Sequence, residues 1–217
     1  MDDDVEQEVQ RLFARVTEAL ARATWALLSA DVTLGRSVVE DDQMIDAQVG
    51  SIEEDLWREL DAIVGASAEV RRLVHLLFVL SELERSADLA EHIAQRAVFG
   101  LGGEMTPVSR GIVQRMSEVA IDMWRSAADV YARGAAGMLD LDETDEELDI
   151  LHERLTGEVA AGSMQPPVAA QVTLLARFYE RLGDHAVNLS RRLRPGDGSL
   201  TGAGEIAPDT SGGPPDG

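Results

Sequence analysis

Two segments of the chain carry the same pair of acidic residues, four positions apart. Glu84 and Asp88 belong to Glu-Leu-Glu-Arg-Ser-Ala-Asp, and Glu180 and Asp184 belong to Phe-Tyr-Glu-Arg-Leu-Gly-Asp. The two pairs are offset by 96 positions, and each follows an apolar run with helical spacing. Carboxylates at i and i+4 lie on one face of a helix, where they can share a metal ion or bridge two.

Two further acidic pairs with the same spacing precede them. Asp42 with Asp46 lies on the helix before Glu84, and Asp145 with Asp149 lies on the helix before Glu180. A short turn joins the two helices in each half, so they should be antiparallel neighbours whose carboxylates meet. The expected clusters are Asp42, Asp46, Glu84 and Asp88 in the first half, and Asp145, Asp149, Glu180 and Asp184 in the second.

The chemistry of these clusters depends on their burial. Glu84 and Asp88 continue the apolar line of Leu73, Leu77 and Leu80, which predicts that they face the core. Buried carboxylates need an arginine, a proton or a metal ion. Oxygen ligands suit Mg²⁺, Ca²⁺ or Mn²⁺, whereas an imidazole such as His92 would favour Zn²⁺ or iron. Acidic pairs on exposed helices are often only solvated, and this alternative remains open.

The elements that must position these acids are all predicted to be helical. The composition is rich in Ala, Leu and Val, and only 4% of the residues are aromatic, which favours packed helices. Helices are expected over about 4–29, 31–64, 67–98, 107–136, 140–159 and 166–194, with a glycine-rich linker at 100–107. We predict an all-α fold of two pseudo-symmetric three-helix repeats, 1–99 and 100–194, followed by a disordered tail, 195–217.

The composition excludes several classes of function. A net charge of −21 argues against nucleic acid and against direct binding to anionic membranes. The chain has no cysteine, so disulfides and thiolate metal sites are excluded. The longest apolar run, 73–80, is too short to span a bilayer, and the acidic N-terminus is not a secretory signal. These two features predict a cytoplasmic protein. No nucleophile, zinc-protease or phosphate-loop motif occurs, so we predict that the protein is not an enzyme.

Together, these motifs resemble the PhoU family of phosphate-signalling regulators over about residues 5–194. The resemblance is carried by Glu-Arg-Leu-Gly-Asp-His-Ala-Val-Asn at 180–188, its earlier echo, Asp-Gln-Met-Ile-Asp at 42–46, and the three-plus-three helix plan. It implies that the eight acids named above form motifs able to bind metal clusters. The first motif reads Glu-Arg-Ser-Ala-Asp where the family usually has Glu-Arg-Ile-Gly-Asp, which indicates a divergent member.

The resemblance also implies a function. A PhoU protein would be a cytoplasmic, metal-binding regulator that contacts a Pst-type phosphate ABC transporter and a PhoR-type sensor histidine kinase. It would repress the phosphate-starvation response when phosphate is plentiful, and we expect a homodimer holding Fe, Zn, Mn or Mg. Two alternatives are a metal-dependent enzyme, for which the sequence offers no distinct acid or base, and a purely structural helical interaction module.

Overall fold

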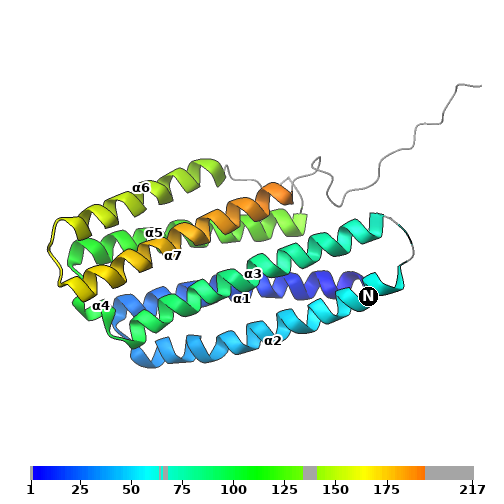
Figure 1. Cartoon of the computed structure of the whole chain (residues 1–217), viewed down its shortest axis with the longest axis horizontal. Helices are drawn as coiled ribbons and strands as arrows, with labels where there is room; N and C mark the ends of the chain where they lie inside the picture. Colours follow the sequence, from blue (N-terminus) through cyan, green and yellow to red (C-terminus); the bar gives the residue numbers. More distant parts are fainter. Residues whose placement is uncertain (1, 64, 66–67, 134–140, 194–217) are drawn as a thin grey trace, which may run out of the picture.

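The computed structural model describes residues 2–63, 65, 68–133 and 141–193, and every regular element within them is an α-helix (Figure 1). The all-α prediction is confirmed. The helices are α1 (Asp2–Ser29), α2 (Val32–Ala62), α3 (Ala68–Val98), α4 (Leu101–Glu104), α5 (Pro107–Arg133), α6 (Leu141–Ala160) and α7 (Pro166–Arg192). In the described part of the chain, no helix combines the length and hydropathy needed to cross a bilayer.

The six long helices match the expected ones to within a few residues at each end, and the linker differs. Residues 100–107, predicted as a loop, contain the single-turn helix α4, in which the Met105 amide donates to the Leu101 carbonyl oxygen at 3.2 Å. The expected end of the helix at 136 and the tail 195–217 lie outside the described residues. The repeat boundary between residues 99 and 100 stays a prediction.

The long helices run side by side in an elongated bundle (Figure 1). In the first half, α2 packs against α1 and α3, and in the second half α6 packs against α5 and α7. The halves meet where α1 packs on α5 and where α3 packs on α7. The outer helices α2 and α6 therefore lie on opposite flanks, and each forms a seam with the last long helix of its own half.

Apolar residues at helical spacing form one core shared by both halves. On α1, a buried stripe runs through Val9, Leu12, Val16, Leu20 and Leu27. Phe13 of α1 contacts the rings of two α5 residues, with centroids 6.2 Å from Trp124 and 5.3 Å from Tyr131. Burial of these large side chains across α1 and α5 holds the halves together.

Close approach of α4 to the end of α1 requires a glycine. A Cβ atom added at Gly102 would overlap the carbonyl oxygen of Leu27. The Arg110 guanidinium of α5 donates hydrogen bonds to the carbonyl oxygens of Leu28 and Gly102. This satisfies a carbonyl in the last turn of α1, which has no partner further along its own helix. The linker between the halves is thereby fixed against α1.

We expect Gly102→Ala to lower the free energy of unfolding by about 1–3 kcal/mol, because the added methyl group has no room against the α1 backbone. The neighbouring Gly103→Ala is the matched control, since a Cβ there meets no atom within 4 Å. Gly103→Ala should leave stability unchanged or raise it by up to roughly 1 kcal/mol. Urea unfolding of both variants measures the difference, and equal effects would contradict the close approach.

Candidate metal centre

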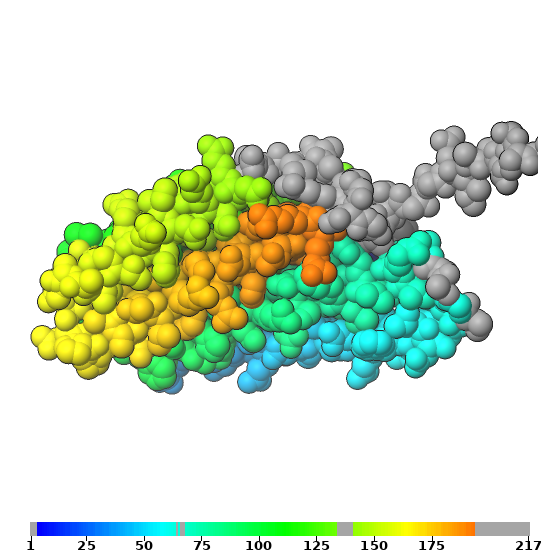
Figure 2. Space-filling view, turned by 45° about the horizontal axis from the view of Figure 1, so that its top comes forward, coloured from blue at the N-terminus to red at the C-terminus, as the bar shows by residue number. Residues whose placement is uncertain are grey.

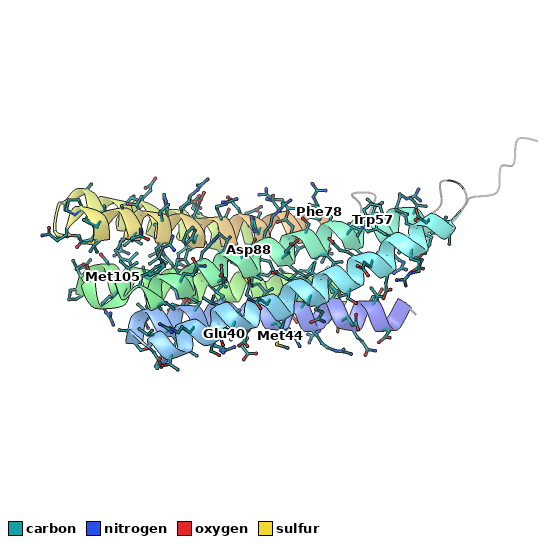
Figure 3. The ribbon with its side chains drawn as sticks, turned by 60° about the horizontal axis from the view of Figure 1, so that its bottom comes forward. Glu40, Met44, Trp57, Phe78, Asp88 and Met105 are labelled. Carbon is teal, nitrogen blue, oxygen red and sulfur yellow. The ribbon has the colours of Figure 1, made fainter. Side chains whose placement is uncertain are left out.

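Three carboxylates meet in the seam between α2 and α3. Asp42 and Asp46 of α2 and Asp88 of α3 each offer an oxygen that lies within 4.8 Å of those of the other two. Asp88 lies near the middle of the molecule (Figure 3). Antiparallel packing explains the meeting, because Asp42 and Asp88 are about equally far from the turn that joins α2 to α3. The structure thus assembles most of the first cluster that the sequence predicts.

The burial predicted for Glu84 and Asp88 is wrong. Glu84 and Asp42 are half-buried, whereas Asp88 and Asp46 are exposed. The apolar line through Leu77 lies at the edge of the core stripe of α3, since Leu77 itself is only half-buried. Acids that continue this line therefore point into a solvent-lined seam and not into the core. Water and counterions, as well as a metal ion, can reach them.

Like charges crowd Asp42. Burial, and then the carboxylates of Asp46, Glu91, Asp88 and Glu84, together raise the pKa of Asp42 to about 7. Among the described residues, none of the four predicted acids of this half forms an ion pair with a cationic side chain. A cation placed among these oxygens would relieve the repulsion and would hold Asp42 ionised at neutral pH.

Two further acids of this seam, Glu53 and Glu91, were not among the ligands predicted from the sequence. Burial raises the pKa of Glu84 most, and the negative charges of Glu53, Asp88 and Asp46 raise it as well, in that order. Glu53 and Glu91 are both half-buried. Each lies seven positions after a predicted ligand, Glu53 after Asp46 and Glu91 after Glu84. Two helical turns return a residue to the same face, so a search at this wider spacing would have found both.

The second half brings its acids near one another less tightly. Burial, and then the charges of Asp149 and Asp184, raise the pKa of Asp145 to about 6, and Arg191 opposes this shift. Within the described ranges, these acids do not form a second group of three oxygens within 4.8 Å. A Cβ at Gly183 would lie 3.0 Å from Asp145 Oδ1, so this glycine allows α6 to approach α7 at the site.

Arginines compensate the acids of the second half. Arg177 donates to the Glu180 carboxylate, and Arg191 Nη2 lies 2.8 Å from Asp142 Oδ1. Glu91 of the first half has Val187 as its counterpart at the same offset of 96 positions. At the matching positions the second seam lacks the counterpart of Glu91, and Arg177 pairs with one of its four predicted acids, which weakens its attraction for a metal ion.

His92 does not complete a ligand set. Its ring stacks on Phe178 of α7, with centroids 5.4 Å apart, and it is absent from the group formed by Asp42, Asp46 and Asp88. Four residues advance an α-helix by about 40° beyond one full turn. His92 therefore lies on the side of α3 that faces α7, and Asp88 on the side that faces α2. The donors that the structure brings together are carboxylate oxygens, which favour hard cations such as Mg²⁺ or Mn²⁺.

We expect Asp42→Asn to stabilise the chelator-treated protein at about pH 8 by roughly 1 kcal/mol, with little effect at about pH 4. The folded-state pKa is raised from 3.8 to about 7. The stability that protonated Asp42 contributes is therefore fully present below pH 3.8 and is lost as the pH rises through about 7. Asparagine carries no charge at any of these pH values, so the variant avoids this loss. Glu40→Gln, on the outer edge of α2 (Figure 3), is the control and should show no such pH dependence. Thermal unfolding across pH measures both, and an unchanged difference between pH values would contradict the crowding.

Comparison with known proteins identifies the family to which this chain is similar. A family model described as the PhoU domain matches residues 9–97 and again residues 113–193. The PhoU homolog 2 of Mycobacterium tuberculosis, a phosphate-specific transport system accessory protein, is 31% identical over 179 residues, which cover 81% of this chain and 84% of that protein. The homolog of Rhizobium meliloti is 25% identical, covering 87% and 84% of the two chains.

The fold agrees with the sequence comparison. The crystal structure of PhoU from Pseudomonas aeruginosa superposes with a TM-score of 0.80 at 25% identity, covering 88% of this chain and 94% of that one. The double match falls on the two halves that carry the acidic pairs. Membership of this family makes the chain a non-enzymatic protein, as the sequence predicted. The chain belongs to the PhoU family, as a divergent member.

Proposed function

We propose that this protein is a metal-binding regulator of phosphate uptake and of phosphate-starvation signalling. The observation that carries the proposal is the PhoU match in both halves of the chain. Its relatives are named accessory proteins of a phosphate-specific transport system, and a structural neighbour from Streptococcus pneumoniae is titled a phosphate transport system regulatory protein. In this proposal the protein acts in the cytoplasm as a homodimer, on a Pst-type transporter and a PhoR-type histidine kinase.

The metal would occupy the seam between α2 and α3. Asp42, Asp46 and Asp88 supply three oxygens within 4.8 Å of one another, and Glu84 can add a fourth ligand from the next turn of α3. Mg²⁺ and Mn²⁺ fit this oxygen donor set best, while Fe and Zn are the metals that the family resemblance suggests. A bound cation would join α2 to α3 and would change the charge presented on this face. In this proposal, a protein partner recognises the joined helices or the altered surface charge.

Metal binding is expected to depend more on the first half than on the second. Asp88→Asn should weaken Mn²⁺ binding roughly 10-fold or more, because it removes one of three converging charges. Asp184→Asn, at the matching position of the second half, should have a smaller effect, since arginines already pair with acids there. Isothermal titration of the chelator-treated variants with MnCl₂ measures both. Equal losses would contradict the asymmetry, and no binding by the unmodified protein would refute the metal site.

Deleting the gene should raise phosphate-regulated transcription in phosphate-rich medium, because the proposed repressor is absent. Restoring the unmodified gene should return transcription to its repressed level. A gene carrying Asp42→Asn, Asp46→Asn and Asp88→Asn then separates the two parts of the proposal. Loss of repression with normal protein levels makes the metal part of the signal, whereas retained repression removes metal from the mechanism. Unchanged transcription after deletion would refute the regulatory function.

A further inference from the structure

The two contacts between the halves differ in kind. Where α1 meets α5, a polar network lies in the middle of the contact: Thr24 Oγ1 donates to the Leu20 carbonyl oxygen at 2.9 Å and accepts from Ser117 Oγ at 3.0 Å. The one unpaired buried group described at this contact is the hydroxyl of Tyr131, a neutral group. The Tyr179 hydroxyl of α7 lies 2.6 Å from Thr24 Oγ1, completing the network. Around it pack large apolar side chains, including Phe13 against Trp124. This contact combines apolar burial with paired hydrogen-bonding groups.

Where α3 meets α7, a carboxylate is buried without full compensation. The Glu82 side chain is only 6% exposed. Its Oε1 lies 3.4 Å from Arg85 Nη1, a long contact, and its Oε2 accepts no hydrogen bond. Across the seam, His185 Nδ1 lies 3.8 Å from Oε2, which is beyond hydrogen-bond range. A buried acceptor in this position loses its water without gaining a partner.

His185 Nδ1 forms its hydrogen bond with Ser86 and not with Glu82. The Ser86 hydroxyl donates its one proton to the Glu82 carbonyl oxygen at 2.7 Å, so at His185, 3.0 Å away, Ser86 Oγ can only accept. His185 Nδ1 therefore carries the proton and directs it to Ser86. Burial, and then the charges of Arg181 and Arg85, lower the pKa of His185 to about 4, so the imidazole is neutral at pH 7 and has no second N–H to offer Glu82.

Other polar atoms of this seam are also unsatisfied. Arg96 stacks on the Phe178 ring, 5.3 Å from its centroid, and its buried Nε has no hydrogen-bond partner. Arg192 of α7 covers Phe78 of α3, 3.8 Å from the ring centroid. The Nε2 atom of His75, on the same helix as Phe78, is likewise buried and unpaired. Such groups are rare in folded proteins, and among the described residues Glu82, Arg96 and His75 all lie on α3, which forms this seam.

We propose that α3 and α7 separate while α1 and α5 stay in contact, so that the two halves hinge about the α1–α5 interface. Opening admits water to Glu82, Arg96 and His75, which offsets the loss of contact between the helices. Figure 2 shows α7 lying along α3 at the surface of the molecule. Because α3 stays packed on α2, and α7 on α6, both acidic clusters move as units relative to each other.

The chain has no cysteine, so one introduced thiol reports the opening of one interface. Ser86→Cys places a thiol in the α3–α7 seam, and Ser117→Cys places one in the α1–α5 contact. Ser86 is 0% and Ser117 4% exposed, and each substitution removes a hydroxyl from a neighbouring polar group. Labelling with a thiol reagent under native conditions then compares the two. We expect the Ser86→Cys protein to react about 10-fold faster or more, with a weak dependence on urea, because local opening exposes little surface.

Adding Glu82→Met to the Ser86→Cys protein tests the cause. The apolar side chain fills the same space without an unpaired acceptor, so labelling should slow several-fold. Equal labelling of the two thiols, or a urea dependence as steep as that of global unfolding, would overturn the hinge. Unchanged labelling after Glu82→Met would overturn the part assigned to Glu82. Both readouts are independent of metal and of phosphate signalling, so the proposed function stands or fails separately.

Discussion

Apart from Glu82, the charged side chains that the structure describes stay out of the fully buried core of this bundle, and they lie at its surface and in the seams where neighbouring helices meet. This constraint decides where chemistry is possible. The inner faces of α1, α3, α5 and α7 are filled by apolar side chains, and each outer helix leaves a seam with its partner. In the α2–α3 seam, Asp42, Asp46 and Asp88 converge, and among the described residues none of the three forms an ion pair with an arginine or histidine. Their repulsion is the physical reason why this seam should attract a metal ion.

The two halves share a plan but have diverged in charge. The first seam adds Glu53 and Glu91 to the predicted acids, whereas the second has Val187 in place of Glu91 and pairs its acids with Arg177 and Arg191. An arginine can neutralise a carboxylate permanently, while a metal ion can be exchanged. A protein of this form would keep one responsive site and one static site, although both arise from the same repeated motif.

The sequence predicted the parts of the structure that depend on periodicity. Helical spacing located the long helices, and equal distances from the turn brought Asp42 opposite Asp88. Burial was predicted less well, because the width of the core face of α3 depends on the helices packed against it, α1, α2, α4 and α7, and residue spacing alone does not place them. Glu82 was missed for a related reason: its repeat counterpart is Phe178, so no duplicated motif marks it, and its importance comes from His185 of a distant helix.

The central claim is that the α2–α3 seam holds a cation among Asp42, Asp46 and Asp88. Anomalous diffraction from crystals grown with Mn²⁺ tests it directly, because the signal locates the metal without assuming its ligands. The account predicts a peak within coordination distance of all three carboxylates, and a weaker peak or none between Asp145 and Asp184. A crystal with Mn²⁺ bound only elsewhere, and with the first seam empty, would contradict it.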